Sequence, residues 1–509
     1  MEGITLSDRD VMMIEAMGMT KDKVLEQIRL LQVGTIPVRL NRPCTVNDGI
    51  KVLTEKEQEE CVRAHDEAVL SGKVMKFVPA SGAASRMFQE WCLAFQQGGF
   101  RSRKQAVEFA IALKKFAFFK DLQSALHRNG MDFDGLVKEG RYVEILAHIL
   151  TDKGLNYASL PKALLKFHVY GDKSRTALEE HLVEAVLYTR DGHNNCRMHV
   201  TVSPEHERLV KVHLSDVLPA YQAQYGVRLI VEVSVQQAST NTITVDLDNR
   251  PVRDQRGNLV FRPGGHGALL YNLYATDGDV IMIKNIDNVV PDRLKEKTVY
   301  YKKVLGGCLI LIQKNAFRYA EALSGTGAGG VIPGAERFLS ETFHAAPPPG
   351  YSTLAEREKI DYLFDKLNRP IRVCGMVRNE GEPGGGPFWV DEEGGGQTLQ
   401  VVEQAQVSQD SEEQRKIWQS STHFNPVDIA CGIRDHRARK FDLKKFVDEK
   451  AYIISRKMQN GIEIKTLELP GLWNGSMARW NTVFIEVPVE TFNPVKTVYD
   501  LLRKQHGPS

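Results

Sequence analysis

One stretch of small residues is followed directly by an arginine, a pattern suited to binding phosphate groups. Residues 80–86 (ASGAASR) follow residues 74–79, which are largely apolar and compatible with a buried strand, and precede an amphipathic helix. A loop of small residues lets backbone N–H groups approach phosphate oxygens, and the start of the next helix adds positive partial charge. Arg86 can then donate charge-assisted hydrogen bonds to a phosphate. Small-residue turns before helices are also common where no phosphate binds.

Two lysines stand in motifs that can direct an ammonium group towards a phosphate. Lys162 follows Pro161 at the start of an apolar segment. Lys496 lies shortly after Pro494 and precedes residues 498–502, where we expect an amphipathic helix. An ammonium group in either place can neutralise phosphate charge. A solvated surface lysine is the alternative interpretation of each.

An aspartate follows the most uniformly apolar strand candidate. Residues 280–283 show no polar alternation, which is typical of a strand covered on both faces. Asn285, Asp287 and Asn288 come directly afterwards, where open α/β sheets place ligands. Asp287 is a hard oxygen ligand suited to Mg²⁺, which takes one or two carboxylates plus substrate phosphates. A cap on a loop is the alternative role for such a side chain.

A glycine-histidine-glycine sequence forms a further candidate contact. Gly265 and Gly267 allow close backbone approach to a ligand, and His266 adds a directional hydrogen-bonding group. We expect a helix to start near residues 268–273. A tight turn with a structural histidine is the alternative.

These motifs need a scaffold that brings distant parts of the chain together. A capping box formed by Thr54 and Glu57 predicts a helix over residues 55–70. Further expected elements are strands at residues 197–202, 228–235 and 241–247. We divide the chain into a helical N-terminal region (1–73), a core (74–410) with a helical insertion at about 100–155, and an α/β part (411–509) that completes the core. The pattern predicts an α/β fold with a mixed, mostly parallel central sheet flanked by helices.

Composition narrows the class of partner. The chain has 509 residues, 66 Lys and Arg against 64 Asp and Glu, and a net charge of +2, so we expect no nucleic-acid or membrane-surface partner. Apolar runs are shorter than the roughly 18 residues of a membrane span, and the first ten residues show no secretory signal pattern. The seven scattered cysteines form no CxxC pair, which indicates reduced thiols in a cytoplasmic protein.

Two other polar clusters are interpreted as structural. His193, Cys196 and His199 lack a clear fourth zinc ligand, so a polar turn followed by a strand is favoured. The acidic residues Glu179, Glu180 and Glu184 are interpreted as one face of a helix near His181, with a role in lining a site left open.

The motifs, taken in order, resemble those of the UDP-sugar pyrophosphorylases in the nucleotidyltransferase superfamily that makes nucleotide sugars. Residues 80–87 and 161–164 are similar to that family's glycine-rich first loop and its Pro-Lys segment. Residues 265–267 resemble its Gly-His-Gly motif, residues 285–288 its Asn-x-Asp-Asn strand end, and residues 494–502 its late Pro-Val-Lys-Thr-x-x-Asp-Leu-Leu motif. The whole chain also looks like an uncharacterised bacterial family of unknown function.

The first loop departs from that family in one respect. Ser81 and Ala84 stand where the family has glycines. A Cβ atom at either place narrows the backbone cradle for nucleotide phosphates.

The resemblance implies a Rossmann-like nucleotide-diphospho-sugar transferase fold and a Mg²⁺-dependent reaction. A nucleoside triphosphate such as UTP and a sugar 1-phosphate would give a nucleotide sugar and pyrophosphate. By resemblance, Arg86, Lys162 and Lys496 act on the phosphates, and Asp287 holds Mg²⁺. The implied nucleotide contacts are Ala80, Ser81, Gly82, Gln236, Gly265, His266 and Gly267, and the implied sugar contacts are Glu403, in a Val-Glu motif at residues 399–407, and Asn425.

Two other functions remain open. The altered first loop suits a non-catalytic nucleotide or nucleotide-sugar binding protein, and related sheets also serve glycosyltransferases. Residues 80–86 lack the GxGxxG spacing of a dinucleotide-binding dehydrogenase.

Overall fold

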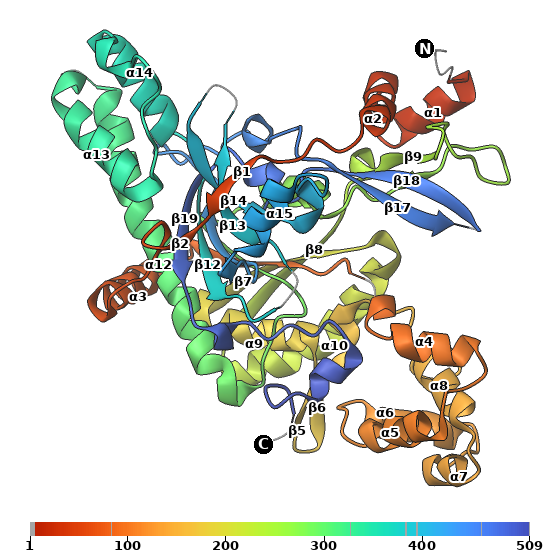
Figure 1. Ribbon diagram of the computed structural model, residues 1–509. Coiled ribbons are helices and arrows are strands. Elements are labelled where there is room, and N and C mark those ends of the chain that lie inside the picture. The colour runs from red at the N-terminus through yellow and green to blue at the C-terminus, as the bar shows by residue number, and fades with distance from the viewer. Residues whose placement is uncertain are drawn as a thin grey trace. The chain divides into compact units, whose positions relative to one another are not determined.

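The computed structural model describes residues 6–82, 84–325, 327–381, 384–392, 395–459 and 461–507. The fold is mixed α/β, with central strands that run mostly parallel and flanking helices, so the predicted fold class is confirmed (Figure 1). The chain divides into two compact units of three segments each. The first unit comprises Met1–Ala68, Gln236–Ile283 and Lys303–Val489, and the second comprises Val69–Val235, Lys284–Lys302 and Glu490–Ser509.

Three parallel strands form the sheet of the second unit. They are β4 (Val74–Pro79), β7 (Asn195–Val202) and β8 (Arg228–Val235), and β7 pairs with both others. The helix α9 (Ala177–Thr189) packs on β4 and β7, and α10 (Glu207–Tyr225) packs on β8. All three strands fall where the apolar runs predicted them. A hairpin of β5 (Lys166–Tyr170) and β6 (Lys173–Thr176) precedes α9.

The predicted helical insertion is present in the second unit. Its helices are α5 (Arg103–Leu113), α6 (Phe119–Arg128), α7 (Phe133–Lys138) and α8 (Tyr142–Leu150), and they form one group with α4 (Gln89–Gln96), the predicted helix after the small-residue loop (Figure 1, orange). Aromatic rings hold the group together: the ring of Trp91 meets that of Phe109 edge-on at 5.1 Å, and Phe118 meets Tyr157 edge-on at 5.1 Å.

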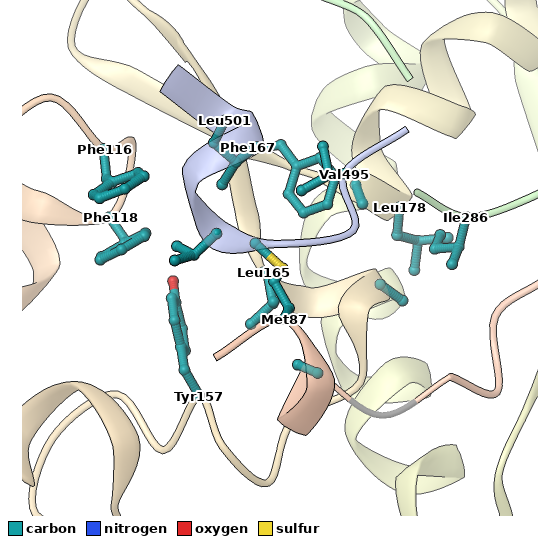
Figure 2. Close-up of a cluster of buried hydrophobic side chains, with 14 of the residues drawn as sticks. Met87, Phe116, Phe118, Tyr157, Leu165, Phe167, Leu178, Ile286, Val495 and Leu501 are labelled. Atoms are coloured by element: carbon teal, nitrogen blue, oxygen red, sulfur yellow. The ribbon is translucent and has the colours of Figure 1, made fainter. Parts of the chain in front are cut away.

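One hydrophobic cluster of the second unit contains side chains from each of the four segments there in which the sequence predicts phosphate or metal contacts. Met87, Leu165, Ile286 and Val495 are all buried in it (Figure 2). Burying one such side chain stabilises a fold by about 1.5–3 kcal/mol. The loop after β4, the Pro-Lys segment, the Asp287 loop and the late motif are therefore anchored in one shared hydrophobic core.

The first unit contains the parallel strands β2 (Thr45–Val46), β3 (Gly49–Lys51), β19 (Asn481–Glu486) and β12 (Ile371–Arg378), in that order. Next to β12 lie the antiparallel β16 (Asp428–Gly432) and the short β15 (His423–Phe424). The strand β11 (Val280–Lys284) follows β16, and its last residue belongs to the second unit.

Two smaller antiparallel sheets complete the strands of the first unit. One joins β1 (Leu40–Pro43), β13 (Gly386–Asp391) and β14 (Gln397–Val402); the other joins β10 (Phe261–Arg262), β9 (Thr242–Asp246), β18 (Ile462–Glu468) and β17 (Ile453–Gln459). The remaining helices are α11 (Leu270–Ala275), α12 (Asp292–Leu323, shared between the units), α13 (Ile332–Phe343), α14 (Glu356–Leu367) and α15 (Glu412–Gln419).

The N-terminal region holds three helices, α1 (Asp8–Ala16), α2 (Lys21–Val33) and α3 (Glu55–Leu70), and also the strands β1 to β3. The predicted capping box of α3 is confirmed, since the Thr54 N–H donates to Glu57 Oε2 at 2.8 Å and the Glu57 N–H donates to Thr54 Oγ1 at 3.3 Å. The strands arise because residues 35–53 are rich in proline and β-branched residues, which disfavour a helix.

All seven cysteines are free thiols, as their spacing predicts. Within the described ranges, the helices are too short or too polar to cross a bilayer.

Candidate functional site

Lys162 and Asp287 form the centre of a charged site in the second unit. Lys162 Nζ lies 2.7 Å from Asp287 Oδ2 and donates a second hydrogen bond to the Val495 carbonyl oxygen at 3.0 Å. Both charged side chains are mostly buried, with 13% and 21% of their surfaces exposed. A 3₁₀ turn (Lys162–Leu164) after Pro161 aims the lysine, and Asp287 follows the end of β11. Two motifs that the sequence places far apart thus meet directly.

The late motif joins the same centre through its backbone. The Val495 N–H donates to the Asp287 carbonyl at 3.0 Å, and the Asn493 N–H donates to Asn288 Oδ1 at 2.9 Å. Lys496 comes next, with its N–H held by the Asp500 carboxylate at 2.9 Å and its ammonium 5.9 Å from the Phe492 ring centre. The predicted helix after it is a 3₁₀ turn (Val498–Leu502) that buries Val498 and Leu501. Asp287 and Lys496 therefore belong to adjacent segments of one site.

The small-residue loop after β4 borders these segments. The Lys162 N–H donates to the Gly82 carbonyl at 3.3 Å, and the Ala84 N–H donates to the Leu160 carbonyl at 3.1 Å. Arg86 ends a 3₁₀ turn (Ala84–Arg86), and its side chain is exposed. The loop and the Pro-Lys segment thus pack side by side.

Two of the loop's backbone donors are already engaged. The Ala80 N–H donates to the Thr201 carbonyl at 2.8 Å, in addition to the Ala84 bond, and the Ser81 carbonyl accepts from Ser203 Oγ at 2.9 Å. Ala84 is fully buried, so its Cβ is part of the core. A Cβ atom added at Gly82 would meet no atom within 4 Å, so open space adjoins the loop there.

Asp287 is the carboxylate in this centre that fits a metal. Among the described residues, no group of three His, Cys, Asp or Glu side chains is arranged to hold an ion on its own. Mg²⁺ needs only one or two protein carboxylates when substrate phosphates supply further oxygens. The donor set therefore fits Mg²⁺ bound together with a phosphate substrate.

The acidic residues on α9 form a buried ion network that the sequence interpretation did not anticipate. Glu184 Oε2 lies 2.8 Å from Lys76 Nζ, Glu184 Oε1 lies 2.8 Å from Lys284 Nζ, and all three side chains are at most 1% exposed. Burial alone would raise the pKa of the Glu184 carboxyl, but Lys284 and Lys76 hold it well below its usual range. Burial lowers the pKa of Lys76 to about 7. The signal in the sequence was a lysine inside each of two apolar strands, which requires a buried partner.

His181, one turn before Glu184, contacts the Asp287 loop. Its Nε2 lies 3.1 Å from the Ile286 carbonyl oxygen. A carbonyl only accepts, so Nε2 carries the proton and the Nδ1 atom does not in the neutral ring. Burial lowers the pKa of His181 well below its usual value, which keeps this ring neutral.

A second buried network occupies the preceding turn of α9. Glu180 bonds to His168 Nδ1 at 2.9 Å and pairs with Lys295, whose ammonium also reaches the Val290 carbonyl. His168 Nε2 lies 2.9 Å from Nδ1 of His506 near the C-terminus. Burial would raise the pKa of Glu180, yet His168 and Lys295 lower it to about 2.

The Gly-His-Gly motif lies in the first unit and is packed tightly. An added Cβ at Gly267 would lie 2.2 Å from the Pro470 carbonyl oxygen, so this glycine is required for close backbone contact. The ring of His266 stacks on Trp473 at 4.2 Å, and its Nδ1 accepts from the Leu472 N–H at 3.0 Å. Gly265 has a positive φ of 74°, a conformation that favours glycine. A helix begins directly afterwards, as predicted.

Glu403 lies next to this motif. Its Oε1 is 3.6 Å from His266 Nε2. Burial would raise its pKa, but His266 and Trp473 hold the pKa below the ordinary value of a glutamate. Glu403 also lines a cavity of about 410 Å³ with Asn379, Trp418 and His423. The structure therefore brings two of the predicted ligand contacts of the first unit, His266 and Glu403, together.

Two other predicted ligand contacts of the first unit, Gln236 and Asn425, bond to groups other than His266 and Glu403. Gln236 Nε2 donates to Asn241 Oδ1 at 3.4 Å. Asn425 is buried, its Nδ2 donates to the Gly375 carbonyl at 3.0 Å, and its Oδ1 accepts from the Val427 N–H at 3.0 Å. Because backbone groups take up both ends of the Asn425 amide, its evident role is to support the turn before β16.

The stretch around His193 forms no metal site within the described ranges. His193 is exposed in the turn before β7, whereas Cys196 and His199 are buried within the strand. This outcome confirms the interpretation as a turn and a strand.

The site and fold define a mixed α/β protein in which Lys162 pairs with Asp287 beside the segment that carries Lys496. The chain belongs to the DUF4301 family, described as a domain of unknown function, whose model matches residues 7–507. The predicted membership in a family of unknown function is thereby confirmed. No curated protein matches the sequence.

Solved structures similar to this chain include several nucleotide-sugar enzymes. A UDP-glucose phosphorylase from Trypanosoma brucei has 14% identity and a TM-score of 0.44, with 97% of this chain and 77% of that chain covered. A uridine diphosphate N-acetylglucosamine pyrophosphorylase from the same organism has 12% identity and a TM-score of 0.46, with 95% and 74% covered. A UDP-glucose pyrophosphorylase variant from Leishmania major has 13% identity and a TM-score of 0.46, with 98% and 79% covered.

Proposed function

We propose that this protein is a sugar nucleotidyltransferase that uses a nucleoside triphosphate and a sugar 1-phosphate and releases pyrophosphate. The observation that carries the proposal is the contact of Lys162 with both Asp287 and the Val495 carbonyl. It gathers into one place a carboxylate, the segment of Lys496 and the loop of Arg86. The order of the motifs in the sequence supports the same conclusion.

The reaction needs charge neutralisation more than proton transfer. An oxygen of the sugar phosphate attacks the α-phosphorus of the triphosphate in line, the bond to the bridging oxygen breaks, and pyrophosphate leaves. The attacking group is already an anion, so no general base is required. The protein must therefore position two anions and stabilise the charge of the transition state.

The proposed roles follow from position. Lys162 and Lys496 neutralise charge near the α-phosphoryl group, and the exposed Arg86 binds the outer phosphates and the leaving pyrophosphate. Before substrate binds, Lys162 keeps the mostly buried Asp287 carboxylate compensated. Asp287 would hold Mg²⁺, which supplies Lewis-acid stabilisation of phosphate charge when bound. UTP as the nucleotide, Mg²⁺ as the metal and a cytoplasmic location stay predictions.

The first unit supplies groups suited to a nucleoside or a sugar. Trp473 and His266 form a stacked pair, and Glu403 lines the adjoining 410 Å³ cavity with carboxylate oxygens that can accept from sugar hydroxyls. We propose that these groups form a binding site for a nucleoside or a sugar within the first unit.

A panel assay tests the proposal. The purified protein is incubated with Mg²⁺, each nucleoside triphosphate and a series of sugar 1-phosphates, and pyrophosphate is measured. We expect release with at least one pair and its loss in Asp287→Ala and Lys496→Ala. The matched control is Asp361→Ala, which removes an exposed carboxylate paired with Arg357 on α14 and should keep the wild-type rate. A folded wild-type protein that is silent across the panel contradicts the proposal.

A non-catalytic nucleotide-binding protein is the second candidate. The engaged N–H groups of Ala80 and Ala84 favour it, because they leave fewer backbone donors for phosphates. Calorimetry that shows tight nucleotide binding, together with no pyrophosphate release, would select this function over the first.

A further inference from the structure

A single carboxylate joins the two strands that lead into the charged site. Lys76 lies in β4 shortly before the 80–86 loop, and Lys284 is the last residue of β11, shortly before Asp287. Their ammonium groups bind different oxygens of Glu184, each at 2.8 Å. Glu184 lies on α9, which packs on β4. Any shift of one strand end relative to the other must therefore stretch a contact to this carboxylate.

Three further contacts connect α9, β4 and the Asp287 loop. Lys76 Nζ also donates to the His181 carbonyl at 3.2 Å, and the His181 ring donates from Nε2 to the Ile286 carbonyl at 3.1 Å. The Ile286 N–H in turn donates to the Pro79 carbonyl at 3.4 Å. One helical turn of α9 thus contacts β4 through Lys76 and the segment just before Asp287 through Lys284 and Ile286.

Stability alone does not account for this arrangement. Removing two ammonium groups and a carboxylate from water costs several kcal/mol per ion, and apolar replacements of similar size are often as stable or more stable. Such a network does, however, confine its members to one geometry, since each carboxylate oxygen of Glu184 is held by a different lysine at 2.8 Å. Phosphoryl transfer depends on this kind of confinement because small displacements of the reacting groups are costly.

We propose that Glu184 is a positioning residue that sets the distance between the 80–86 loop and the Asp287 loop. The proposal rests on the proposed nucleotidyl transfer for its kinetic consequence, but its structural consequence is independent of substrate. Glu184 contacts no reacting group; it acts through Lys76, Lys284 and His181.

Two variants and one control test the proposal. Glu184→Gln removes the charge that both lysines share, and we expect kcat to fall about 100-fold with a much smaller change in KM for the triphosphate. The triple variant Lys76→Met, Glu184→Met, Lys284→Met replaces the whole network by apolar side chains. We expect the Tm of the triple variant to lie closer to the wild-type value than the Tm of Glu184→Gln does, while its kcat stays as low as that of Glu184→Gln. If Glu184→Gln does not fold, the triple variant carries the test.

The matched control is Asp10→Asn in the first unit. Asp10 is 2% exposed and Glu184 is 0% exposed, so the two carboxylates are similarly buried. Each oxygen of Asp10 accepts a hydrogen bond from Arg253 at 2.8 Å. This variant should lower Tm while kcat stays at the wild-type value. A triple variant with wild-type kcat, or a control that loses kcat as Glu184→Gln does, would overturn the proposal.

Hydrogen exchange on the substrate-free protein separates the two proposals. We expect amides of residues 84–88 and 285–290 to exchange faster in Glu184→Gln than in the wild type, with no such change in Asp10→Asn. Unchanged exchange in both segments contradicts the positioning role, whatever the activity. Faster exchange in a protein whose wild type never releases pyrophosphate would support the positioning role and reject the proposed function.

Discussion

Lys162 and Asp287, 125 positions apart in the sequence, form a 2.7 Å ion pair, and the same ammonium reaches the Val495 carbonyl 333 positions beyond it. This relationship organises the second unit. It links the Pro-Lys segment, the end of β11 and the late motif through one side chain. The hydrophobic cluster in Figure 2 contains a residue next to each of them, namely Leu165, Ile286 and Val495. The functional groups are thus held by both polar and apolar contacts.

Lys162 is the first residue to vary. Lys162→Met leaves Asp287 without its ammonium and removes positive charge from the phosphates, so we expect a loss of about 100-fold or more in kcat. Lys162→Arg should recover little, because a planar guanidinium does not replace a compact ammonium. The control is Lys445→Met, which changes an exposed lysine of the first unit. Equal rates for Lys162→Met and the control would show that the ion pair has no catalytic part.

Glu180 gives a prediction about acid stability. Its pKa is about 2 in the fold, below the ordinary value of 4.5. A lowered pKa stabilises the fold above pH 4.5, and this contribution, a few kcal/mol, is lost as the pH falls towards 2. Urea unfolding across this range should show that Glu180→Gln is less stable than the wild type at pH 6 and that the difference shrinks in acid. A difference independent of pH would contradict the lowered pKa.

Phe118 tests the helical insertion. Its ring is 1% exposed, stacks on Phe116 at 5.0 Å and meets Tyr157 edge-on. Phe118→Ala should lower the free energy of unfolding by about 3–5 kcal/mol, through lost burial and the cavity left behind. Val107→Ala on α5, where the side chain is 40% exposed, should change it little. Similar unfolding midpoints for the two variants would show that this aromatic cluster is not a core.

Two glycines are expected to respond in opposite ways. Gly267→Ala forces a Cβ against the Pro470 carbonyl, so it should lower Tm clearly. Gly82→Ala meets open space, so Tm should stay near the wild-type value while affinity for the triphosphate falls, because the added methyl group narrows the phosphate loop. Thermal unfolding and nucleotide titration measure both effects. Unchanged nucleotide affinity in Gly82→Ala would show that this loop does not bind the nucleotide.

The sequence predicted the charged centre because its signals are local. Asp287 follows an apolar strand, Lys162 directly follows Pro161, and Lys496 stands in a Pro-Val-Lys-Thr motif, so no knowledge of tertiary contacts was needed to select them. The helices and strands around them were predictable for the same reason, since periodicity and capping act over a few residues.

Tertiary contacts explain what was missed. Glu184 looks like a surface residue of an acidic helix, but α9 is buried along almost its whole length, and there Glu184 meets Lys76 and Lys284. The strands β1 and β3 pair with β13 and β19, from far along the chain, so residues 40–51 gave no strand pattern of their own. The Asn425 amide is taken up by backbone groups of a distant strand and of the adjacent turn, which a motif cannot reveal.

Isotope exchange tests nucleotidyl transfer most directly. Labelled pyrophosphate is incubated with the protein, Mg²⁺ and candidate nucleotide sugars, and label is sought in the nucleoside triphosphate. We expect label to enter the triphosphate only when a nucleotide sugar is present, and Asp287→Ala to abolish the exchange while the variant remains folded. A folded wild-type protein that binds a nucleotide sugar but exchanges no label, or full exchange in Asp287→Ala, would contradict nucleotidyl transfer at this centre.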